Sequence, residues 1–98
     1  FPHTTSTLAS LAHNANGKFV TVGCLVGSAK KILTKKGEAM LFVQMEDMTG
    51  RAEALVFPRT LRHTETVWQE GTIALIKGTV SDKDGSLKIL TEDALKIA

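Results

Sequence analysis

The sequence predicts an all-β fold, a small closed barrel of five strands with a short helix between the third and fourth. Short runs rich in β-branched and apolar residues recur along the chain and are separated by glycine-containing turns. Glycines also interrupt the longest run, which is typical of a strand that bends. A chain of 98 residues has room for one core, which buries about 60–70% of the surface that the unfolded chain exposes.

The N-terminal segment is predicted to form a short helix over residues 4–15. Its apolar residues recur at the spacing of one helical face: Leu8, Leu11, Ala12 and Ala15. Asn16-Gly17 would end the helix, because both residues tolerate the left-handed conformation. We therefore predict a single domain, with a helical lead-in over residues 1–17 and a barrel over residues 18–98.

The first strand is predicted over residues 18–34, where Gly23 and Gly27 are expected to mark a bulge or a sharp bend. A long bent strand is what closure of a small barrel requires, because one strand must pair on both sides. A hairpin connection at Lys35-Lys36-Gly37-Glu38 then leads into the second strand, residues 40–47.

Alternation along the second and third strands separates a core face from an outward face. A tight turn at Met48-Thr49-Gly50 joins the second strand to the third, residues 51–57. The expected core face carries Leu41, Val43, Met45, Ala52, Ala54 and Val56. The opposite face carries Met40, Phe42, Gln44, Glu46, Arg51, Glu53, Leu55 and Phe57.

The chain after Pro58 is predicted to begin with a helix, because proline ends the third strand. This short helix covers residues 59–69 and ends near Glu70-Gly71. Phe57 and Trp68 are expected in the core, as a plug between barrel and helix. Cys24 is also expected to be buried, as free cysteine usually is.

The last two strands are predicted to form a hairpin. The fourth covers residues 72–81 with a bend at Gly78, and the fifth covers residues 86–92. Asp82-Lys83-Asp84-Gly85 suits a type I′ turn between them, and residues 93–98 add one turn or a strand extension. Five strands with a helix between the third and fourth are the arrangement of the OB fold, a Greek-key barrel.

Three pieces of the sequence together resemble one known family. They are the Thr34-Lys35-Lys36-Gly37 hairpin, the Glu46-Asp47-Met48-Thr49-Gly50 turn and the Val56-Phe57-Pro58 strand end. The combination resembles the OB domain near the C-terminal end of the bacterial replicative DNA polymerase III alpha subunit, of the C family of polymerases. The resemblance covers about residues 18–92. The first strand departs from it at Cys24, where the family commonly carries glycine.

The resemblance implies a barrel that contacts the single-stranded template ahead of the polymerase active site, in the bacterial cytoplasm. It implies two partners, single-stranded DNA and the rest of a replicative polymerase. The catalytic carboxylates of the family lie in other domains, and no residue of this chain matches them. No serine, cysteine or lysine stands at motif spacing from a base either. We therefore predict that the isolated domain is not an enzyme.

Composition argues against several other classes of site. Cys24 is the only cysteine, so an internal disulfide and a thiolate zinc site are excluded and a reducing setting is predicted. His3, His13 and His63 share no spacing, and Asp82-x-Asp84-Gly85 lacks the other ligands of a calcium loop. No metal or cofactor is therefore predicted. No run approaches the ~18 apolar residues of a membrane span, and no signal peptide is apparent. The chain also lacks an initiator methionine, which predicts a fragment of a longer protein.

A site for a single strand needs cations along the backbone path and flat faces on which bases stack. The expected cations are Lys30, Lys31, Lys35, Lys36, Arg51 and Lys83. OB proteins use the first–second and fourth–fifth strand loops as the walls of their cleft, and Lys35, Lys36 and Lys83 lie in those loops. Lys30 and Lys31 alternate along the strand, so only one of them can face the groove.

Phe42 is the expected stacking residue, because the opposite face of its strand is core. Glu46 and Glu53 share its face and would repel phosphates. With one platform and a net charge of +2, the sequence predicts weak, sequence-tolerant binding of single-stranded DNA by an accessory module.

Other interpretations stay open at this point. The lysine hairpin is also compatible with a merely solvated surface, and Phe42 with packing at a barrel end or under the N-terminal helix. RNA recognition, as in the anticodon-binding OB domains of some tRNA synthetases, is one alternative function. A protein-interaction or architectural barrel is the other, since OB folds host many functions. The oligomeric state, including exchange of a terminal strand, is also open.

Overall fold

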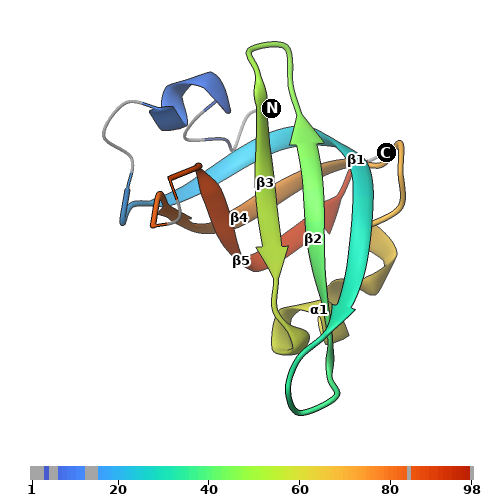
Figure 1. Cartoon of the computed structure of the whole chain (residues 1–98). Helices are drawn as coiled ribbons and strands as arrows, with labels where there is room; N and C mark the ends of the chain where they lie inside the picture. The colour runs from blue at the N-terminus through green and yellow to red at the C-terminus, as the bar shows by residue number, and fades with distance from the viewer. Residues whose placement is uncertain (1–3, 5–6, 13–15, 84, 98) are drawn as a thin grey trace.

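Five strands close into a barrel in the computed structural model of the chain (Figure 1). The structure describes residues 4, 7–12, 16–83 and 85–97. The strands are β1 (Phe19–Leu33), β2 (Ala39–Glu46), β3 (Arg51–Val56), β4 (Ile73–Ser81) and β5 (Lys88–Lys96). Their order around the barrel is β1-β2-β3-β5-β4, in which β3 and β5 are parallel and the other neighbours antiparallel. The predicted five-stranded barrel is confirmed.

The β1 strand closes the barrel because it pairs with two neighbours in succession. Residues 19–25 pair with β4, and residues 25–33 pair with β2. The register with β2 shifts between Val26 and Ala29. A Cβ atom on Gly27, inside this shift, would lie 3.0 Å from the carbonyl oxygen of Gln44. Of the two glycines predicted to bend the strand, Gly27 therefore marks the bulge, whereas Gly23 pairs regularly with β4.

A second bulge bends β4 at Gly78, as predicted. The register with β5 shifts between Lys77 and Gly78. A Cβ atom on Gly78 would collide with the carbonyl oxygen of Leu90 and would lie 2.8 Å from Cγ2 of Ile89. This approach of two strands leaves no room for a side chain, so glycine is required here by packing.

The core is built from the inward side chains of all five strands. The alternation predicted for β2 and β3 is confirmed, since Val43, Met45, Ala54 and Val56 are at most 1% exposed and Leu41 is buried. Ala52 packs against the same cluster. Cys24 and Trp68 are buried, as expected from the sequence.

The helical segment after β3 consists of α1 (Pro58–Thr64) and a 3-10 turn, η2 (Glu65–Val67). Pro58 stands in the first turn of α1, where its missing N–H would have no intrahelical partner anyway. The helical segment predicted between the third and fourth strands is confirmed, and it ends at Val67, a few residues earlier than expected. None of the helices in the described part of the chain is long and apolar enough to cross a membrane.

Within its described residues, the N-terminal segment forms a 3-10 helix and not the predicted α-helix. The described part forms a 3-10 helix, η1 (Ala9–Ala12), in which amides donate to carbonyls three residues earlier. Leu8 and Leu11 are buried, as the helical spacing predicted. Ala15 and several neighbours of the predicted helix, residues 5, 6 and 13–15, lie outside the described residues. The helix over residues 4–15 is therefore not seen as one continuous element.

Asp47, in the β2–β3 turn, anchors η1 from a distance. Its carboxylate accepts hydrogen bonds from the Leu8 amide at 2.9 Å, the Thr49 amide at 2.7 Å, the Thr49 hydroxyl at 2.6 Å and the Gly50 amide at 3.0 Å. The Thr49 hydroxyl accepts a further bond from the Ala9 amide at 3.0 Å. Partial burial acts to raise the pKa of Asp47, but these hydrogen bonds outweigh it and hold the pKa below its ordinary range. The turn thus supplies the caps that η1 lacks.

The fifth strand extends further toward the C-terminus than the predicted strand over residues 86–92. β5 continues to Lys96, so the strand extension foreseen for the tail is the correct alternative. In the β4–β5 turn, the Gly85 amide donates to the Asp82 carbonyl at 3.0 Å and Gly85 has φ +83°. Asp84 lies outside the described residues, so the type I′ geometry stays a prediction.

Candidate nucleic-acid interface

The side chains that point away from the core on the paired parts of β1, β2, β3 and β5 are called the outer face. Its two central strands, β2 and β3, cross the front of the barrel in Figure 1. Strand pairing sets these side chains in rows across the sheet. One row contains Lys30, Phe42, Leu55 and Leu90, each in register with the next. The next row contains Gln44, Glu53 and Lys88. A third contains Glu46 and Arg51.

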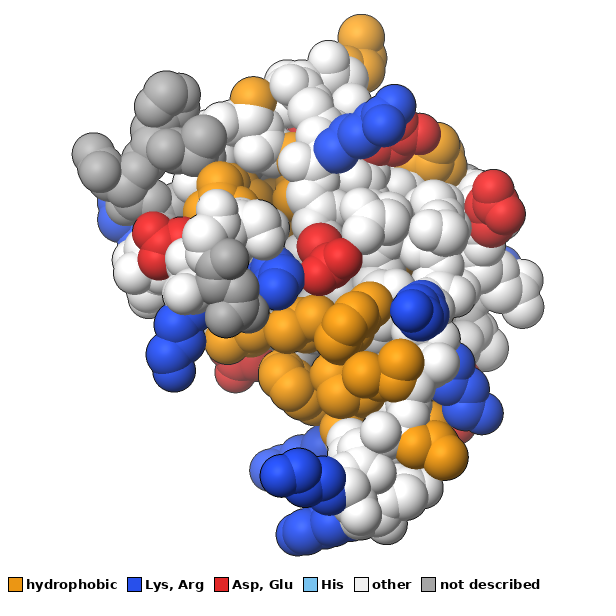
Figure 2. Space-filling view, in the orientation of Figure 1, with side chains coloured by type: hydrophobic (Ala, Val, Ile, Leu, Met, Phe, Trp, Pro, Cys, Tyr) orange, Lys and Arg blue, Asp and Glu red, His pale blue; other side chains and the backbone are white. Residues whose placement is uncertain are grey.

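The rows divide the outer face into two parts of different chemistry. The hairpin half is defined by Lys30, Ile32, Met40, Phe42, Leu55, Phe57 and Leu90, with the β1–β2 connection, residues 34–38. The turn half is defined by Gln44, Glu46, Arg51, Glu53 and Lys88. Figure 2 shows hydrophobic side chains gathered in one area of this face, with Lys and Arg side chains around it. The two halves therefore have to be considered separately as ligand surfaces.

Phe57 corrects one expectation from the sequence. It was expected in the core, but it is 42% exposed. Its backbone is extended (φ −74°, ψ 161°), so it continues the alternation of β3 and follows Arg51, Glu53 and Leu55 onto the outer face. The helix after it begins with Pro58 and turns away from the strand, so only Trp68 of the expected pair is buried in the core.

The apolar row of the hairpin half is open to solvent. Phe42, Leu55 and Leu90 are all partly exposed, and each is the direct cross-strand neighbour of the next. Met40 belongs to the same face by alternation, yet it is only 8% exposed. Met40 is therefore buried, and Phe42, Leu55 and Leu90 form the accessible apolar surface of this row.

Four lysines, Lys30 and Lys31 near the end of β1 and Lys35 and Lys36 in the β1–β2 connection, are called the hairpin lysines. All four are exposed, and none takes part in an ion pair among the residues that the structure describes. Lys30 is in register with Phe42, and Lys31 with Leu41. The register therefore places Lys30 on the outer face and Lys31 on the opposite side, in agreement with the predicted alternation.

The hairpin also contains one acid, Glu38, which lies 3.8 Å from the guanidinium of Arg62 on α1. Both side chains are about half exposed or more, so the pair is weak. It nevertheless offsets the only carboxylate of the β1–β2 connection. The positive potential of the hairpin lysines is therefore little reduced by neighbouring acids.

The cations of the turn half, in contrast, lie against glutamates. Arg51 is 3.8 Å from Glu46, and Lys88 is 4.0 Å from Glu53. The other carboxylate oxygen of Glu53 accepts a hydrogen bond from Gln44 Nε2 at 2.8 Å. A groove of about 420 Å³ runs beside these residues and is lined in part by Ser86 and Leu87 of the β4–β5 connection. The Glu53 carboxylate is one of the groups that line this groove.

The predicted site residues do not all come together. Lys30 and Phe42 are neighbours in one row, and Lys35 and Lys36 lie at the tip of the same hairpin. Arg51 opens β3 four residues before Leu55, which puts it roughly 13 Å along the strand from the row of Phe42. Lys83 lies in the β4–β5 connection, away from the β1–β2 hairpin in Figure 1.

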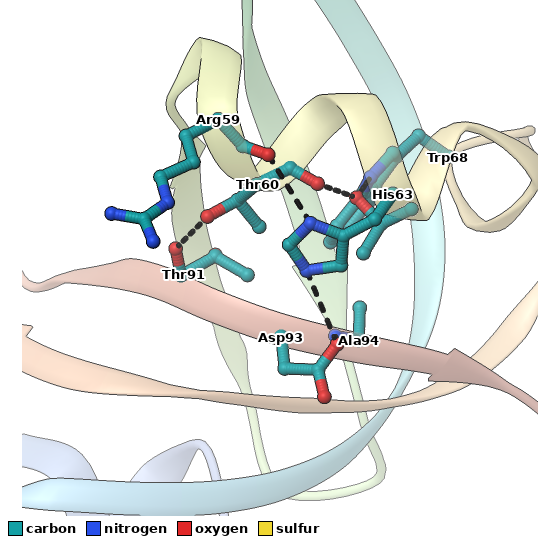
Figure 3. Close-up of polar contacts among 8 residues, drawn as sticks. Arg59, Thr60, His63, Trp68, Thr91, Asp93 and Ala94 are labelled. Carbon is teal, nitrogen blue, oxygen red and sulfur yellow. Dashed lines mark hydrogen bonds and ion pairs between the residues drawn. The ribbon is translucent and has the colours of Figure 1, made fainter.

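A buried chain of hydrogen bonds fixes α1 to the barrel (Figure 3). Trp68 Nε1 donates to the Thr64 hydroxyl at 2.9 Å, which donates to the Thr60 carbonyl at 2.7 Å. The Thr60 hydroxyl donates to the Thr91 carbonyl on β5 at 3.1 Å. Because all three side chains are buried and hydrogen-bonded, they are best explained as the attachment of the helix to the barrel.

His63 gives the same helix a second, exposed contact. Its Nδ1 lies 3.2 Å from the Arg59 carbonyl, and its Nε2 lies 3.6 Å from Asp93 on β5 (Figure 3). Both side chains are more than half exposed, so this contact is worth at most about 1 kcal/mol. Among the residues that the structure describes, no group of three or more His, Cys, Asp and Glu side chains is placed to hold a metal ion.

Comparison with known proteins agrees with this geometry. Residues 20–97 match the family model described as an OB-fold nucleic acid binding domain. The chain is 32% identical to the DNA polymerase III subunit alpha of Haemophilus influenzae over 98 residues, which covers 97% of this chain and 8% of that protein. It is 30% identical to the same subunit of Bacillus subtilis over 83 residues, 85% of this chain and 7% of that protein. The Escherichia coli subunit is 29% identical over 83 residues.

These relatives are much longer than the chain, which spans only 7–8% of the first two. The likeness to the polymerase subunit that the sequence motifs suggested is confirmed for this segment alone. The family match covers all five strands apart from the first residue of β1. The chain therefore belongs to the family of OB-fold nucleic acid binding domains.

Proposed function

We propose that this domain binds single-stranded DNA weakly and with little sequence preference, as an accessory module of a bacterial replicative DNA polymerase. The observation that carries the proposal is the solvent-open apolar row of Phe42, Leu55 and Leu90, next to Lys30 and to a hairpin whose lysines have no ion pair among the described residues. Bases stack on such a row while lysines attract the phosphates. Duplex DNA keeps its bases stacked inside, so it has nothing to place on this surface.

The small number of aromatic stacking residues limits the expected affinity for DNA. Stacking of one base on an aromatic side chain is worth about 1–3 kcal/mol. Phosphate contacts add a sequence-independent term that falls as salt rises, because counterions are released on binding. With few aromatic side chains and Glu53 on the same face, we expect affinities in the micromolar range or weaker.

The likeness to DNA polymerase III subunit alpha supports the polymerase context. In that context the module holds the template strand, chemistry is carried out elsewhere in the longer protein, and the setting is the bacterial cytoplasm. The hairpin half has no residue arrangement suited to catalysis, and its contribution is binding. A weak module is adequate there, because linkage to a larger protein raises the effective concentration of the strand.

Fluorescence anisotropy with labelled oligo-dT tests the proposal. Binding should appear at low salt and weaken steadily as salt is added. The Lys35→Glu/Lys36→Glu variant should lose binding by at least about 10-fold, since it reverses two charges at the hairpin tip. Absence of any anisotropy change with wild-type protein at low salt and high micromolar concentration would refute DNA binding by this domain.

RNA is the main competing ligand. Proteins that distinguish RNA from DNA contact the 2′-hydroxyl with polar groups. The side chains of Phe42, Leu55 and Leu90 offer none, so this surface gives no reason to prefer RNA. We expect RNA and DNA oligomers of matched sequence to compete within a few-fold of each other. A strong preference for RNA would favour the RNA-binding function instead.

A protein-interaction role is separated from DNA binding by the same charge reversal. Under the DNA-binding proposal, Lys35→Glu/Lys36→Glu abolishes oligo-dT binding. A purely architectural barrel would show no oligo-dT binding in the wild type, and its association with the rest of a polymerase would survive the substitutions.

A further inference from the structure

We infer that the bound strand occupies only the hairpin half, with Phe42 and Phe57 as two successive stacking platforms, and that Glu53 excludes it from the groove of the turn half. This inference rests on the proposed function and goes beyond it by fixing the footprint. OB proteins use the whole cleft between the β1–β2 and β4–β5 loops. In this chain the distribution of paired and unpaired charge argues for a shorter path.

The two aromatic side chains are suitably placed relative to each other. Phe42 is in register with Leu55, and Phe57 follows Leu55 by two residues on the same face. Phe42 and Phe57 are therefore diagonal neighbours across β2 and β3, with about 7–8 Å between their Cα atoms. Phe42 is partly exposed and Phe57 is 42% exposed. Two consecutive bases of an extended strand fit such a pair.

The cations lie along the same path. Lys30 flanks Phe42 in its row. Phe57 lies nearer than Phe42 to the start of β2, and residues 34–38 lead from that end to Lys35 and Lys36. A strand that stacks on both rings therefore passes from Lys30 toward the hairpin tip. Its phosphates meet lysines that have no ion pair among the described residues.

The turn half would repel a DNA strand that entered its groove, because Glu53 lines that groove. The Glu53 side chain is only 24% exposed and lies between Gln44 and Lys88, 2.8 Å from one and 4.0 Å from the other. A phosphate in the groove would face this carboxylate, which lines the groove together with Gln44 and Arg51. The nearby cations cannot compensate fully, because Arg51 and Lys88 each already have a glutamate partner.

Titrations of labelled oligo-dT with matched variants test the footprint. Phe57→Leu and Phe42→Leu keep an apolar side chain and each should weaken binding about 5-fold or more, the loss expected for one stacked base. Arg51→Gln and Lys83→Gln remove one cation each from the turn-half side and should change affinity less than 2-fold. Glu53→Gln keeps the shape of the side chain and should tighten binding by about 2-fold or more.

The outcomes separate the footprint from the proposed function. If wild-type protein binds no oligo-dT, the proposed function fails, and the footprint with it. If wild-type protein binds but Arg51→Gln costs more than Phe57→Leu, the strand lies in the groove, and only the footprint is wrong. Amide chemical shifts give an independent measurement, since oligo-dT should perturb residues 30–42 and 55–57 and leave residues 44–53 unchanged. Perturbation confined to residues 44–53 would overturn the inference.

Discussion

The hairpin half and the turn half of the outer face differ in both the number and the arrangement of their charges. The hairpin half has Lys30, Lys35 and Lys36 against Glu38, whereas the turn half has Arg51 and Lys88 against Glu46 and Glu53. The hairpin lysines have no ion pair among the described residues, whereas Arg51 and Lys88 each lie against a glutamate. A cation with a fixed carboxylate neighbour presents a weakened field to a phosphate. The number and the pairing of the charges therefore both favour the hairpin half as the binding surface.

The two halves also differ in what they do for the fold. Beyond the turn half, Asp47 and Thr49 hold η1 with hydrogen bonds from Leu8 and Ala9. The hairpin half extends beyond the closed part of the barrel, since residues 26–33 of β1 pair with no strand other than β2. We therefore expect substitutions near the turn to change stability and substitutions in the hairpin to change binding.

Asp47→Ala should give the largest effect. It removes the acceptor of four hydrogen bonds, so the free energy of unfolding should fall by about 2–4 kcal/mol in urea titrations. Asp47→Asn, which keeps one carbonyl oxygen, should fall between wild type and Asp47→Ala. Oligo-dT affinity, measured under conditions where the variant is folded, should be unchanged. A large loss of affinity in folded Asp47→Asn would break the separation between the two halves.

The salt dependence of binding should distinguish the halves next. Replacing Lys35 and Lys36 by glutamine removes two phosphate contacts, so the slope of log K against log salt should become shallower by about 1.4. Arg51→Gln is the matched control and should leave the slope within error of wild type. Equal changes in the two proteins would mean that the strand contacts both halves.

Acid should weaken the β2–β3 turn around Asp47. The pKa of Asp47 is held below its ordinary range in the folded protein. Its contribution to stability is therefore complete above the pKa of about 3.9 that the group has in the unfolded chain. It is lost as pH falls below that value, through the folded pKa. Unfolding by urea at pH 3 and pH 6 should show a smaller loss for Asp47→Asn than for wild type.

The smallest effect should appear at Cys24. Burial, with the nearby charge of Asp47, raises the pKa of this thiol to about 12, so it should resist alkylation at neutral pH in the folded protein. Cys24 and Asp47 line the same apolar hollow. Asp47→Asn should therefore accelerate labelling several-fold, followed by mass spectrometry. Lys35→Gln should not, and acceleration by both would indicate that the two ends of the barrel open together.

Much of the barrel could be predicted because its signals are local. Alternation assigned the core faces of β2 and β3, and the glycines at 27 and 78 marked both bulges. The 3-10 form of η1 was not predicted, and its hydrogen bonds to Asp47 and Thr49 come from about 40 residues away in the sequence. Spacing within one segment contains no information about such caps.

The site was predicted only in part, for two physical reasons. Alternation had placed Phe57 on the outward face, but the general tendency of large aromatic side chains to be buried favoured the core, and this was wrong. The neighbour of Glu53 on β5, Lys88, was not recognised because the parallel β3–β5 register depends on topology rather than on a hairpin. The Arg51–Glu46 pair, in contrast, flanks the short β2–β3 turn. It could have been predicted by pairing residues on either side of that turn.

The hydrogen-bonded indole of Trp68 gives this protein an intrinsic fluorescence signal that reports on the attachment of α1. The chain has one tryptophan and no tyrosine, so its near-ultraviolet emission comes almost entirely from Trp68. That ring is 6% exposed and is attached through Thr64 and Thr60 to β5. Its emission should shift to longer wavelength when the helix leaves the barrel. Because Trp68 lies in the core and not on the outer face, its emission should not change when single-stranded DNA binds.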